Sequence, residues 1–274
     1  MNKTVKFEKH IKAEKNTQTI LECLSASLEF SNQQIKKILQ NGAVWLENSH
    51  GINRVRRAKK TINQGEILHV YFNAEIQASQ PHEAMLIADE GDYSIWNKPG
   101  GMYSQGTKWG DHCTVYRWAE QNLMPQRQAF IVHRLDKAAN GLIIIAHKKS
   151  TAAKLSAMFE KRQIHKKYRA IVEGILNDVE LPYEIKNELD NKIAISEIIS
   201  LIPDYEKQRT AVEIRIKTGR KHQIRRHLSE MGYPIIGDRL YGAQDIESDL
   251  QLSSIELEFS CPVSEKQKKY ELPL

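Results

Sequence analysis

The fold is decided by one stretch in which a polar loop separates two apolar runs: Ala129-Phe130-Ile131-Val132-His133-Arg134-Leu135-Asp136-Lys137-Ala138-Ala139-Asn140-Gly141-Leu142-Ile143-Ile144-Ile145-Ala146. Both runs are short and rich in β-branched or aromatic residues, which predicts strands over 129–132 and 141–146. The loop between them presents Arg134 and Asp136, and loops carried by a rigid scaffold often hold reactive groups. Taken alone, an arginine two residues before an aspartate is more typical of a structural ion pair than of a catalytic site.

Further strands and one helix flank this stretch. After the last strand candidate, the segment 217–228 becomes helical in its second half, where Ile224, Leu228 and Met231 recur on one face. Gly232 is expected to end that helix. The strand candidates outside the central stretch cover 85–88, 93–96, 166–174 and 212–216. We found no internal repeat and no low-complexity segment.

Residues 17–73 have a separate pattern of short helices and strands. A helix candidate over 19–28 is followed by a capping box, in which the Ser31 hydroxyl accepts from the third helical amide and Gln34 reaches back. The apolar residues of the next helix are expected to face inward: Ile35, Ile38 and Leu39. Strands are expected over 43–46 and 67–71.

Positive charge is concentrated in the first third of the chain. Residues 1–80 hold 12 Lys and Arg against 7 Asp and Glu, whereas the remaining 194 residues hold 28 against 27. A compact basic segment attached to a nearly neutral body is typical of a module that grips a polyanion. Its candidate contacts are Lys36, Lys37, Arg54, Arg56 and Arg57. The alternative is a solvated basic surface without a partner, and charge alone leaves both interpretations open.

Composition places the 274-residue chain, with 41% hydrophobic and 27% charged residues and a net charge of +6, among globular proteins. No apolar run approaches the roughly 20 residues that span a bilayer. The lysine-rich start has no apolar core of a secretory signal. We therefore expect a soluble, cytoplasmic protein with no membrane partner. The three cysteines lie far apart and indicate neither a zinc site nor a disulfide framework: Cys23, Cys113 and Cys261.

Several motifs occur in a fixed order over about 150 residues: Asn97-Lys98-Pro99-Gly100-Gly101, His133-Arg134-Leu135-Asp136, Lys167-Tyr168-Arg169-Ala170, Thr218-Gly219-Arg220-Lys221-His222-Gln223-Ile224-Arg225 and Gly237-Asp238-Arg239-Leu240-Tyr241-Gly242. In this order they resemble the RluA type of RNA pseudouridine synthase, and the resemblance covers residues 85–242. The basic segment 17–73 resembles the small RNA-binding module named after a ribosomal small-subunit protein. Its hairpin at 45–51 departs from that module, and an ordinary helical cap on the larger domain is the alternative.

The resemblance implies an α+β fold. It comprises a large, mainly antiparallel sheet with a catalytic cleft and flanking helices, preceded by a small domain of two helices and a hairpin. The expected domains are an RNA-binding module over 1–73 (core 17–73), a linker over 74–83 and a pseudouridine synthase domain over 84–274. We expect a monomer.

The resemblance also implies the chemistry. Pseudouridine synthases break the N-glycosidic bond of uridine, rotate the base and rejoin it through carbon. Asp136 matches the essential aspartate, which attacks the ribose, attacks the ring or forms a glycal; the sequence leaves these routes open. Each route needs an ionised carboxylate, and the family pattern assigns the cation that would lower its pKa to Arg225. Tyr168 matches the active-site tyrosine, which stacks on the flipped uracil and is placed for proton abstraction.

Other residues match positions that contact the RNA. The target base must leave its stack, at a cost of a few kcal/mol, and Arg134 matches the residue that enters the vacated space. Ile224 would form an apolar pocket wall, and Arg220 is a phosphate contact or the second choice for the cation. Lys98 and His133 complete the predicted substrate-binding set. An isomerisation requires no metal, nucleotide or redox cofactor, and the histidine spacing does not indicate a metal site.

Two departures from the family leave a second function open. Ala139-Asn140 replaces the usual Thr-Ser, and the segment 103–110 replaces the usual Val-His-Pro. The latter is either a flexible loop that holds RNA or a plain surface loop. The alternative function is a catalytically inactive RNA-binding or ribosome-associated factor, but the intact Asp136, Tyr168 and Arg225 favour the enzyme. We expect a structured RNA as partner, ribosomal rather than transfer RNA, and the sequence does not reveal the target uridine.

Overall fold

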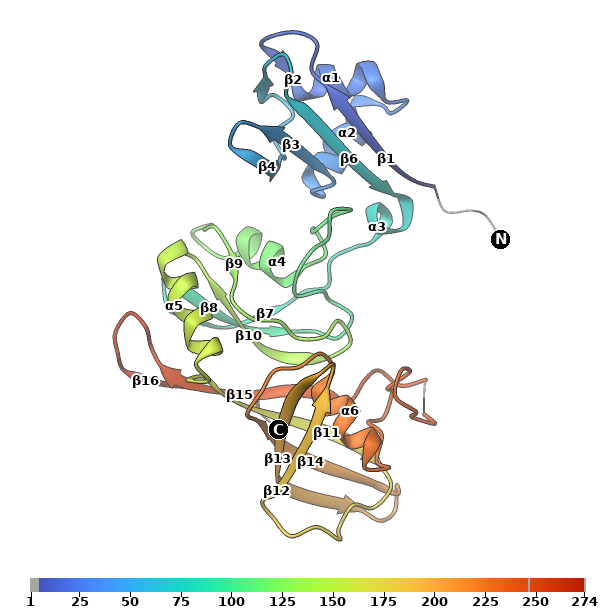
Figure 1. Cartoon of the computed structure of the whole chain (residues 1–274), viewed down its shortest axis with the longest axis vertical. Coiled ribbons are helices and arrows are strands. Elements are labelled where there is room, and N and C mark those ends of the chain that lie inside the picture. Colours follow the sequence, from blue (N-terminus) through green and yellow to red (C-terminus); the bar gives the residue numbers. More distant parts are fainter. Residues whose placement is uncertain (1–4, 246, 274) are drawn as a thin grey trace. The chain divides into compact units, whose positions relative to one another are not determined.

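The computed structural model describes residues 5–245 and 247–273, and the chain forms two compact units (Figure 1). The N-terminal unit contains the chain up to Pro81 together with Gln105–Trp118. The C-terminal unit contains His82–Ser104 and the chain from Ala119 onward. The predicted domains 1–73 and 84–274 include residues 1–4, 246 and 274, which lie outside the described residues.

This division differs from the predicted boundaries at two places. Gln105–Trp118, expected in the larger domain, belongs to the N-terminal unit. Residues 74–83, expected to be a linker, begin with helix α3 (Ala74–Ala78), which the Asn73 side chain caps by accepting from the Ile76 amide at 3.1 Å. Both segments are mostly polar, so apolar periodicity does not indicate that they pack.

A four-stranded antiparallel sheet in the order β1-β6-β3-β4 forms one layer of the N-terminal unit. Helices α1 and α2 both begin with capping boxes, and the box predicted at Ser31 and Gln34 is confirmed. The predicted inward residues Ile35, Ile38 and Leu39 are buried in the core between helices and sheet. The elements are β1 (Lys6–Lys12), β2 (Gln18–Thr19), α1 (Ile20–Ser27), α2 (Asn32–Gln40), β3 (Val44–Asn48), β4 (Gly51–Arg54), β5 (Thr61–Ile62) and β6 (Ile67–Asn73).

A ten-stranded sheet organises the C-terminal unit. Its main order is β12-β13-β14-β11-β15-β10-β8-β7, and β16 and β9 pair with β15 and β10. Among the described strands of this sheet, only β10 and β15 run parallel. The predicted mainly antiparallel sheet is therefore confirmed. The strands are β7 (Met85–Asp89), β8 (Tyr93–Lys98), β9 (Phe130–Ile131), β10 (Asn140–Ala146), β11 (His165–Glu173), β12 (Tyr183–Leu189), β13 (Lys192–Asp204), β14 (Arg209–Ile216), β15 (Leu252–Ser260) and β16 (Gln267–Glu271).

Helices pack beside this sheet. Helix α5 (Lys149–Glu160) contacts β9 and β10, whereas α6 (Gln223–Glu230) contacts β12 and β13. The helix predicted before Gly232 is confirmed as α6, and Gly232 has a φ of 86°. Helix α4 (Val115–Asn122) contains the boundary between the two units. No helix in the described part of the chain is long and apolar enough to cross a membrane.

The central stretch of the sequence forms β9, a loop and β10, as predicted. Strand β9 pairs with the end of β10 through only two residues, Phe130 and Ile131. Strand β10 itself lies between β8 and β15. The loop that carries Asp136 therefore leads directly into an interior strand of the sheet, whose residues Leu142–Ala146 are all fully buried.

Candidate active site

The backbone on both sides of Asp136 is held by the segment that follows β8. The Leu135 amide donates to Ser104 Oγ at 3.0 Å, and the Leu135 carbonyl accepts from the same hydroxyl at 2.8 Å. On the other side, the Lys137 carbonyl accepts from the Gly101 amide at 2.8 Å. Because Ser104 is buried, these bonds fix the loop before any substrate arrives.

Lys98 holds the same loop from within. Its ammonium donates to four carbonyl oxygens, those of Pro99 (2.9 Å), Met102 (2.9 Å), Lys137 (3.3 Å) and Ala139 (2.6 Å). Burial lowers the pKa of Lys98 to about 8, although the negative charge of Asp136 acts to raise it. An ammonium has only three N–H donors. The prediction that Lys98 binds substrate is therefore corrected: its donors are used to anchor the loop.

The Asp136 side chain lies between two basic groups. Its carboxylate is 27% exposed, with Oδ2 at 3.6 Å from Arg225 Nη1 and Oδ1 at 3.8 Å from His222 Nε2. Arg225 thus lies beside Asp136, where the family pattern predicted a cation. The second choice, Arg220, is not part of this group: its Nε donates to the Ile193 carbonyl at 3.1 Å.

A second carboxylate holds Arg225. Asp238 accepts from Arg225 Nε at 2.7 Å and from Nη2 at 2.6 Å, and both side chains are almost fully buried. Burial would raise the pKa of Asp238, but the hydrogen bonds from Arg225 and from the Leu240 amide lower it below its usual value. The Tyr241 ring lies 5.1 Å from the Arg225 Cζ. Arg225 therefore has a fixed orientation with one Nη directed toward Asp136.

Tyr168 is buried on β11, where it pairs with Ile214 on one side and Ser254 on the other. Burial raises the pKa of its phenol, and the negative charge of Asp136 raises it further. The phenol is therefore protonated at neutral pH. It can accept a proton from a substrate only if its own proton leaves in the same step, which refines the proton-abstracting role expected from the sequence.

Three predicted residues remain. Ile224 and Arg134 are close in sequence to Arg225 and Asp136, whereas His133 does not contribute to the site. Ile224 is buried in the first turn of α6, beside Arg225. Arg134 is exposed and forms no hydrogen bond or ion pair within the described part of the chain. His133 instead packs into the fold: Nε2 accepts from the Ile144 amide at 2.9 Å, and its ring centroid lies 4.4 Å from that of Phe159. Its predicted substrate contact is corrected to a structural role.

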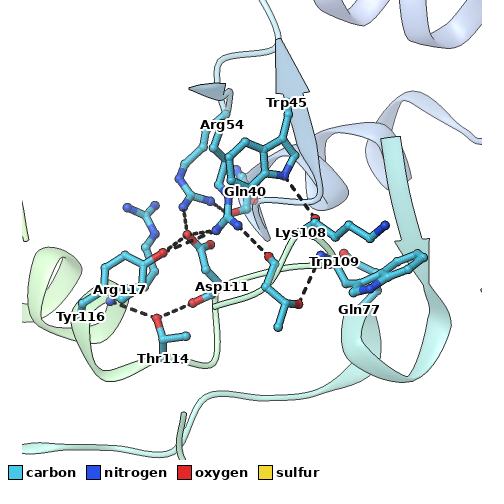
Figure 2. Close-up of polar contacts among 12 residues, drawn as sticks. Gln40, Trp45, Arg54, Gln77, Lys108, Trp109, Asp111, Thr114, Tyr116 and Arg117 are labelled. Carbon is cyan, nitrogen blue, oxygen red and sulfur yellow. Dashed lines mark hydrogen bonds and ion pairs between the residues drawn. The ribbon is translucent and has the colours of Figure 1, made fainter. Parts of the chain in front are cut away.

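The predicted RNA contacts of the N-terminal unit fall into two groups. Lys36, Lys37 and Arg57 are exposed. Arg54 and Arg56 instead both form ion pairs with Asp111, whose side chain is 1% exposed (Figure 2). These two guanidiniums are corrected from RNA contacts to internal partners, because a buried carboxylate needs their charge.

The segment containing Asp111 is ordered rather than a plain surface loop. The Trp45 indole donates to the Lys108 carbonyl at 3.2 Å, and the Gln77 side-chain amide donates to the Trp109 carbonyl at 2.9 Å (Figure 2). Lys108 also forms an ion pair with Glu8 at 2.5 Å. These contacts hold residues 108 and 109 against the rest of the N-terminal unit, and the RNA-holding role considered for the segment 103–110 stays a prediction.

Four residues of the group have no role in the sequence interpretation: Ser104, His222, Asp238 and Tyr241. The last three stand in motifs that the sequence displays, but no local pattern indicates which of them meet. A hollow in the C-terminal unit is lined by Glu173, Lys207, Arg209 and their neighbours, none of which was predicted to be functional. The cleft expected over Asp136 stays a prediction. Among the described residues, no three His, Cys, Asp or Glu side chains are placed to hold a metal ion.

Comparison with known proteins identifies the family. Residues 92–230, half of the chain, match the model of the RNA pseudouridylate synthase family. Ribosomal large subunit pseudouridine synthase D of Vibrio vulnificus (strain CMCP6) is 24% identical over 278 residues, covering 90% of this chain and 84% of that protein. tRNA pseudouridine synthase C of the same strain is 33% identical over 170 residues, covering 53% of this chain and 69% of that protein.

A solved structure shares the fold. Human RNA Pseudouridylate Synthase Domain Containing 1 superposes with a TM-score of 0.60 at 18% identity, covering 72% of this chain and 86% of the human chain. This likeness bears on the fold alone. The family match over half of the chain shows that the protein belongs to the RNA pseudouridylate synthase family, in its RluA branch, and is an isomerase.

Proposed function

We propose that this protein converts specific uridines of a structured RNA, namely ribosomal RNA, to pseudouridine by a mechanism that depends on Asp136 and needs no cofactor. The observation that carries the proposal is the carboxylate of Asp136, which is partly exposed and lies 3.6 Å from Arg225. The Arg225 guanidinium thus lies beside the side chain that each route to pseudouridine uses as its nucleophile or base.

The residues around Asp136 take the following roles in the proposal. Asp136 attacks the ribose or the ring, or acts as the base that forms a glycal. Tyr168 supplies an aromatic face for the extruded uracil, and Ile224 supplies an apolar wall. Arg134 is exposed and unpaired within the described chain, which leaves its guanidinium available to enter the space that the flipped base vacates. Arg220 contacts phosphate.

The extent of the sequence matches favours ribosomal RNA over transfer RNA. The ribosomal enzyme of Vibrio vulnificus matches over 90% of this chain, so the matched part includes most of the N-terminal unit. The transfer RNA enzyme of the same strain matches over 53%, which is shorter than the C-terminal unit alone. The N-terminal unit presents Lys36, Lys37 and Arg57 to solvent, and these are the side chains we propose for phosphate contact.

The second candidate is an RNA-binding factor that has lost turnover, because Ala139-Asn140 replaces the hydroxyl residues of the family. The loop geometry favours the enzyme. Asn140 accepts from the Ser253 hydroxyl on β15, and Ala139 offers its carbonyl to Lys98. Both altered residues thus form contacts that hold the loop.

A chemical map of pseudouridine tests the proposal. Total RNA from the parent strain, from a strain lacking the protein and from one carrying Asp136→Asn is treated with a pseudouridine-specific carbodiimide, and reverse-transcription stops are mapped. We expect at least one stop, in ribosomal RNA, to disappear in both altered strains. A stop that survives Asp136→Asn but disappears on deletion would contradict the role of Asp136, and stops unchanged in both strains would favour the inactive factor.

A further inference from the structure

Each oxygen of the Asp136 carboxylate faces the nitrogen of a basic side chain from the segment that follows β14. Oδ2 faces Arg225, and Oδ1 faces the Nε2 of His222 at 3.8 Å. The family pattern accounts for Arg225 but assigns nothing to His222. The imidazole is not a surface group, since its side chain is 17% exposed.

The two neighbours of the His222 ring, the Tyr241 hydroxyl and the Asp136 carboxylate, together favour one tautomer. The Tyr241 hydroxyl lies 2.8 Å from His222 Nδ1, and no other hydrogen bond of this hydroxyl occurs among the described residues. If the hydroxyl donates to Nδ1, the proton of the neutral imidazole stays on Nε2 and points to Asp136. The opposite tautomer would direct a lone pair at a carboxylate. Electrostatics therefore favour the Nε2–H form.

The backbone of His222 supports a specific task for its side chain. His222 has φ 54° and ψ 28°, in the left-handed region, directly before the first residue of α6. A residue other than glycine costs about 1 kcal/mol there. Glycine would adopt this conformation without that cost. The strained histidine projects its ring between Asp136 and Tyr241, whose ring centroid lies 5.6 Å away in an edge-on arrangement.

We propose that His222 is a positioning residue, which donates from Nε2–H to Asp136 Oδ1 in the substrate complex while Arg225 holds the other oxygen. Two donors on opposite oxygens fix the rotation of the carboxylate, which an arginine alone would leave free. The separation of 3.8 Å shortens to hydrogen-bond length when substrate closes the site, as catalytic contacts commonly do. This inference rests on the proposed role of Asp136.

The charged groups around His222 set the expected pH dependence. Burial lowers the pKa of His222 below its usual value, Asp136 and Asp238 raise it, and Arg225 and Lys221 lower it. The imidazole is therefore neutral near pH 7. Acid protonates it, which removes the acceptor for the Tyr241 hydroxyl and turns the contact with Asp136 into an ion pair. A carboxylate paired with an imidazolium is a weaker nucleophile and base, so the reaction slows as the pH falls.

The test measures chemistry and binding separately. Total RNA from the deletion strain, labelled with tritium at C5 of its uridines, is mixed with excess enzyme, and tritium release is followed because C5 loses its hydrogen when pseudouridine forms. The maximal rate reports chemistry, and the enzyme concentration at half-maximal rate reports binding. His222→Gly removes the imidazole and suits the left-handed backbone. His222→Gln keeps an amide donor that does not titrate, and His165→Gln on an exposed histidine of β11 is the matched control.

We expect His222→Gly to slow tritium release at pH 7 by about tenfold or more with half-saturation unchanged, and His222→Gln to recover most of the rate. The wild type and His165→Gln should lose rate as acid protonates the His222 imidazole, below the usual pH range of a histidine, whereas His222→Gln should lose rate only at still lower pH. The rate of tritium release by Tyr241→Phe should lie between the rates of the two His222 variants. A His222→Gly rate equal to that of the wild type, or a His222→Gln profile with the wild-type acid limb, overturns the inference. Tritium release by Asp136→Asn would instead overturn the proposed function.

Discussion

Gly141 touches the backbone of Ser254: a β-carbon at Gly141 would lie 2.3 Å from the Ser254 carbonyl oxygen and 2.5 Å from its nitrogen. The pair forms part of the parallel contact between β10 and β15, and Ser254 pairs on its other side with Tyr168. Gly141 has a φ of 111°. The glycine therefore sets the distance between β10, which follows the Asp136 loop, and β15, which lies between β10 and the strand that carries Tyr168.

We expect Gly141→Ala to lower the free energy of unfolding by about 3 kcal/mol, because the new methyl adds a backbone clash to the strain of a positive φ. Urea unfolding measures this loss. Gly232→Ala is the matched control, since Gly232 has a φ of 86° but no atom within 4 Å of its β-carbon position. It should cost about 1 kcal/mol. Equal losses in the two variants would show that the contact with Ser254 is unimportant.

Asp238→Asn should slow pseudouridine formation without changing RNA binding. Asparagine offers Arg225 one acceptor in place of two and points an amide donor at the guanidinium, so Arg225 loses its fixed orientation toward Asp136. We also expect a stability loss of about 3 kcal/mol, because the buried arginine keeps only one charged partner, Asp136. Single-turnover rates and thermal unfolding measure the two effects.

The control for Asp238→Asn is Asp245→Asn, which alters an aspartate paired with Arg209 at 3.3 Å on a more exposed part of the unit. This variant should keep the wild-type rate. If Asp238→Asn also keeps the wild-type rate, the bidentate contact with Arg225 does not serve the chemistry.

The sequence predicts those helices and strands whose formation depends on residues adjacent in the chain. The capping box at Ser31 predicts the start of α2, and the apolar runs around the Asp136 loop predict β9 and β10, because the residues that decide these features are adjacent. Strand β1 is not one of these, since of its seven residues only Ile11 is buried and the rest are largely charged. Its strand structure comes from pairing with β6, about sixty residues away.

The candidate active site likewise contains residues that the sequence identifies and contacts that only the fold reveals. The motifs identify Asp136, Tyr168 and Arg225, but the partners of these residues are set by pairing across the sheet. Ser254 reaches Tyr168 only because β15 lies between β10 and β11. Likewise, a basic run containing Arg54 and Arg56 is typical of a polyanion contact, and only the fold reveals a carboxylate 55 residues further along that neutralises Arg56.

Asp111→Asn should destabilise the N-terminal unit rather than weaken its grip on RNA directly. Asp111 accepts from Arg54, Arg56 and the Tyr116 hydroxyl, so the variant leaves two partly buried guanidiniums without a counter-charge. The Coulomb attraction of both arginines outweighs burial and lowers the pKa of Asp111, which keeps this carboxylate ionised. We expect a loss of about 3 kcal/mol, measured by thermal unfolding.

The exposed and the paired arginines of the basic run should respond differently to substitution. Arg57→Ala should leave the unfolding midpoint unchanged and reduce the salt dependence of RNA binding by about one counter-ion per lost phosphate contact. Arg56→Ala should lower the unfolding midpoint and leave the salt slope of the folded protein unchanged. A reduced slope for Arg56→Ala with normal stability would return Arg56 to the RNA-contact set.

Lys98→Met tests whether the ammonium beneath the Asp136 loop positions the carboxylate. Methionine has similar length but no donor, so the carbonyls of Lys137 and Ala139 lose a partner and the reaction should slow with RNA binding unchanged.

Lys98 releases its proton near pH 8 when folded and near 10.5 when unfolded. Between these values the unfolded state binds more protons, so wild-type stability should rise relative to Lys98→Met, by about 1–2 kcal/mol at pH 9.5. Lys166→Met removes a partly buried lysine whose pKa burial also lowers to about 8, and which forms no hydrogen bond with the Asp136 loop among the described residues. Lys166→Met should show the same change of stability with pH and keep the wild-type rate. A wild-type rate for Lys98→Met would instead show that the loop holds its position without the ammonium.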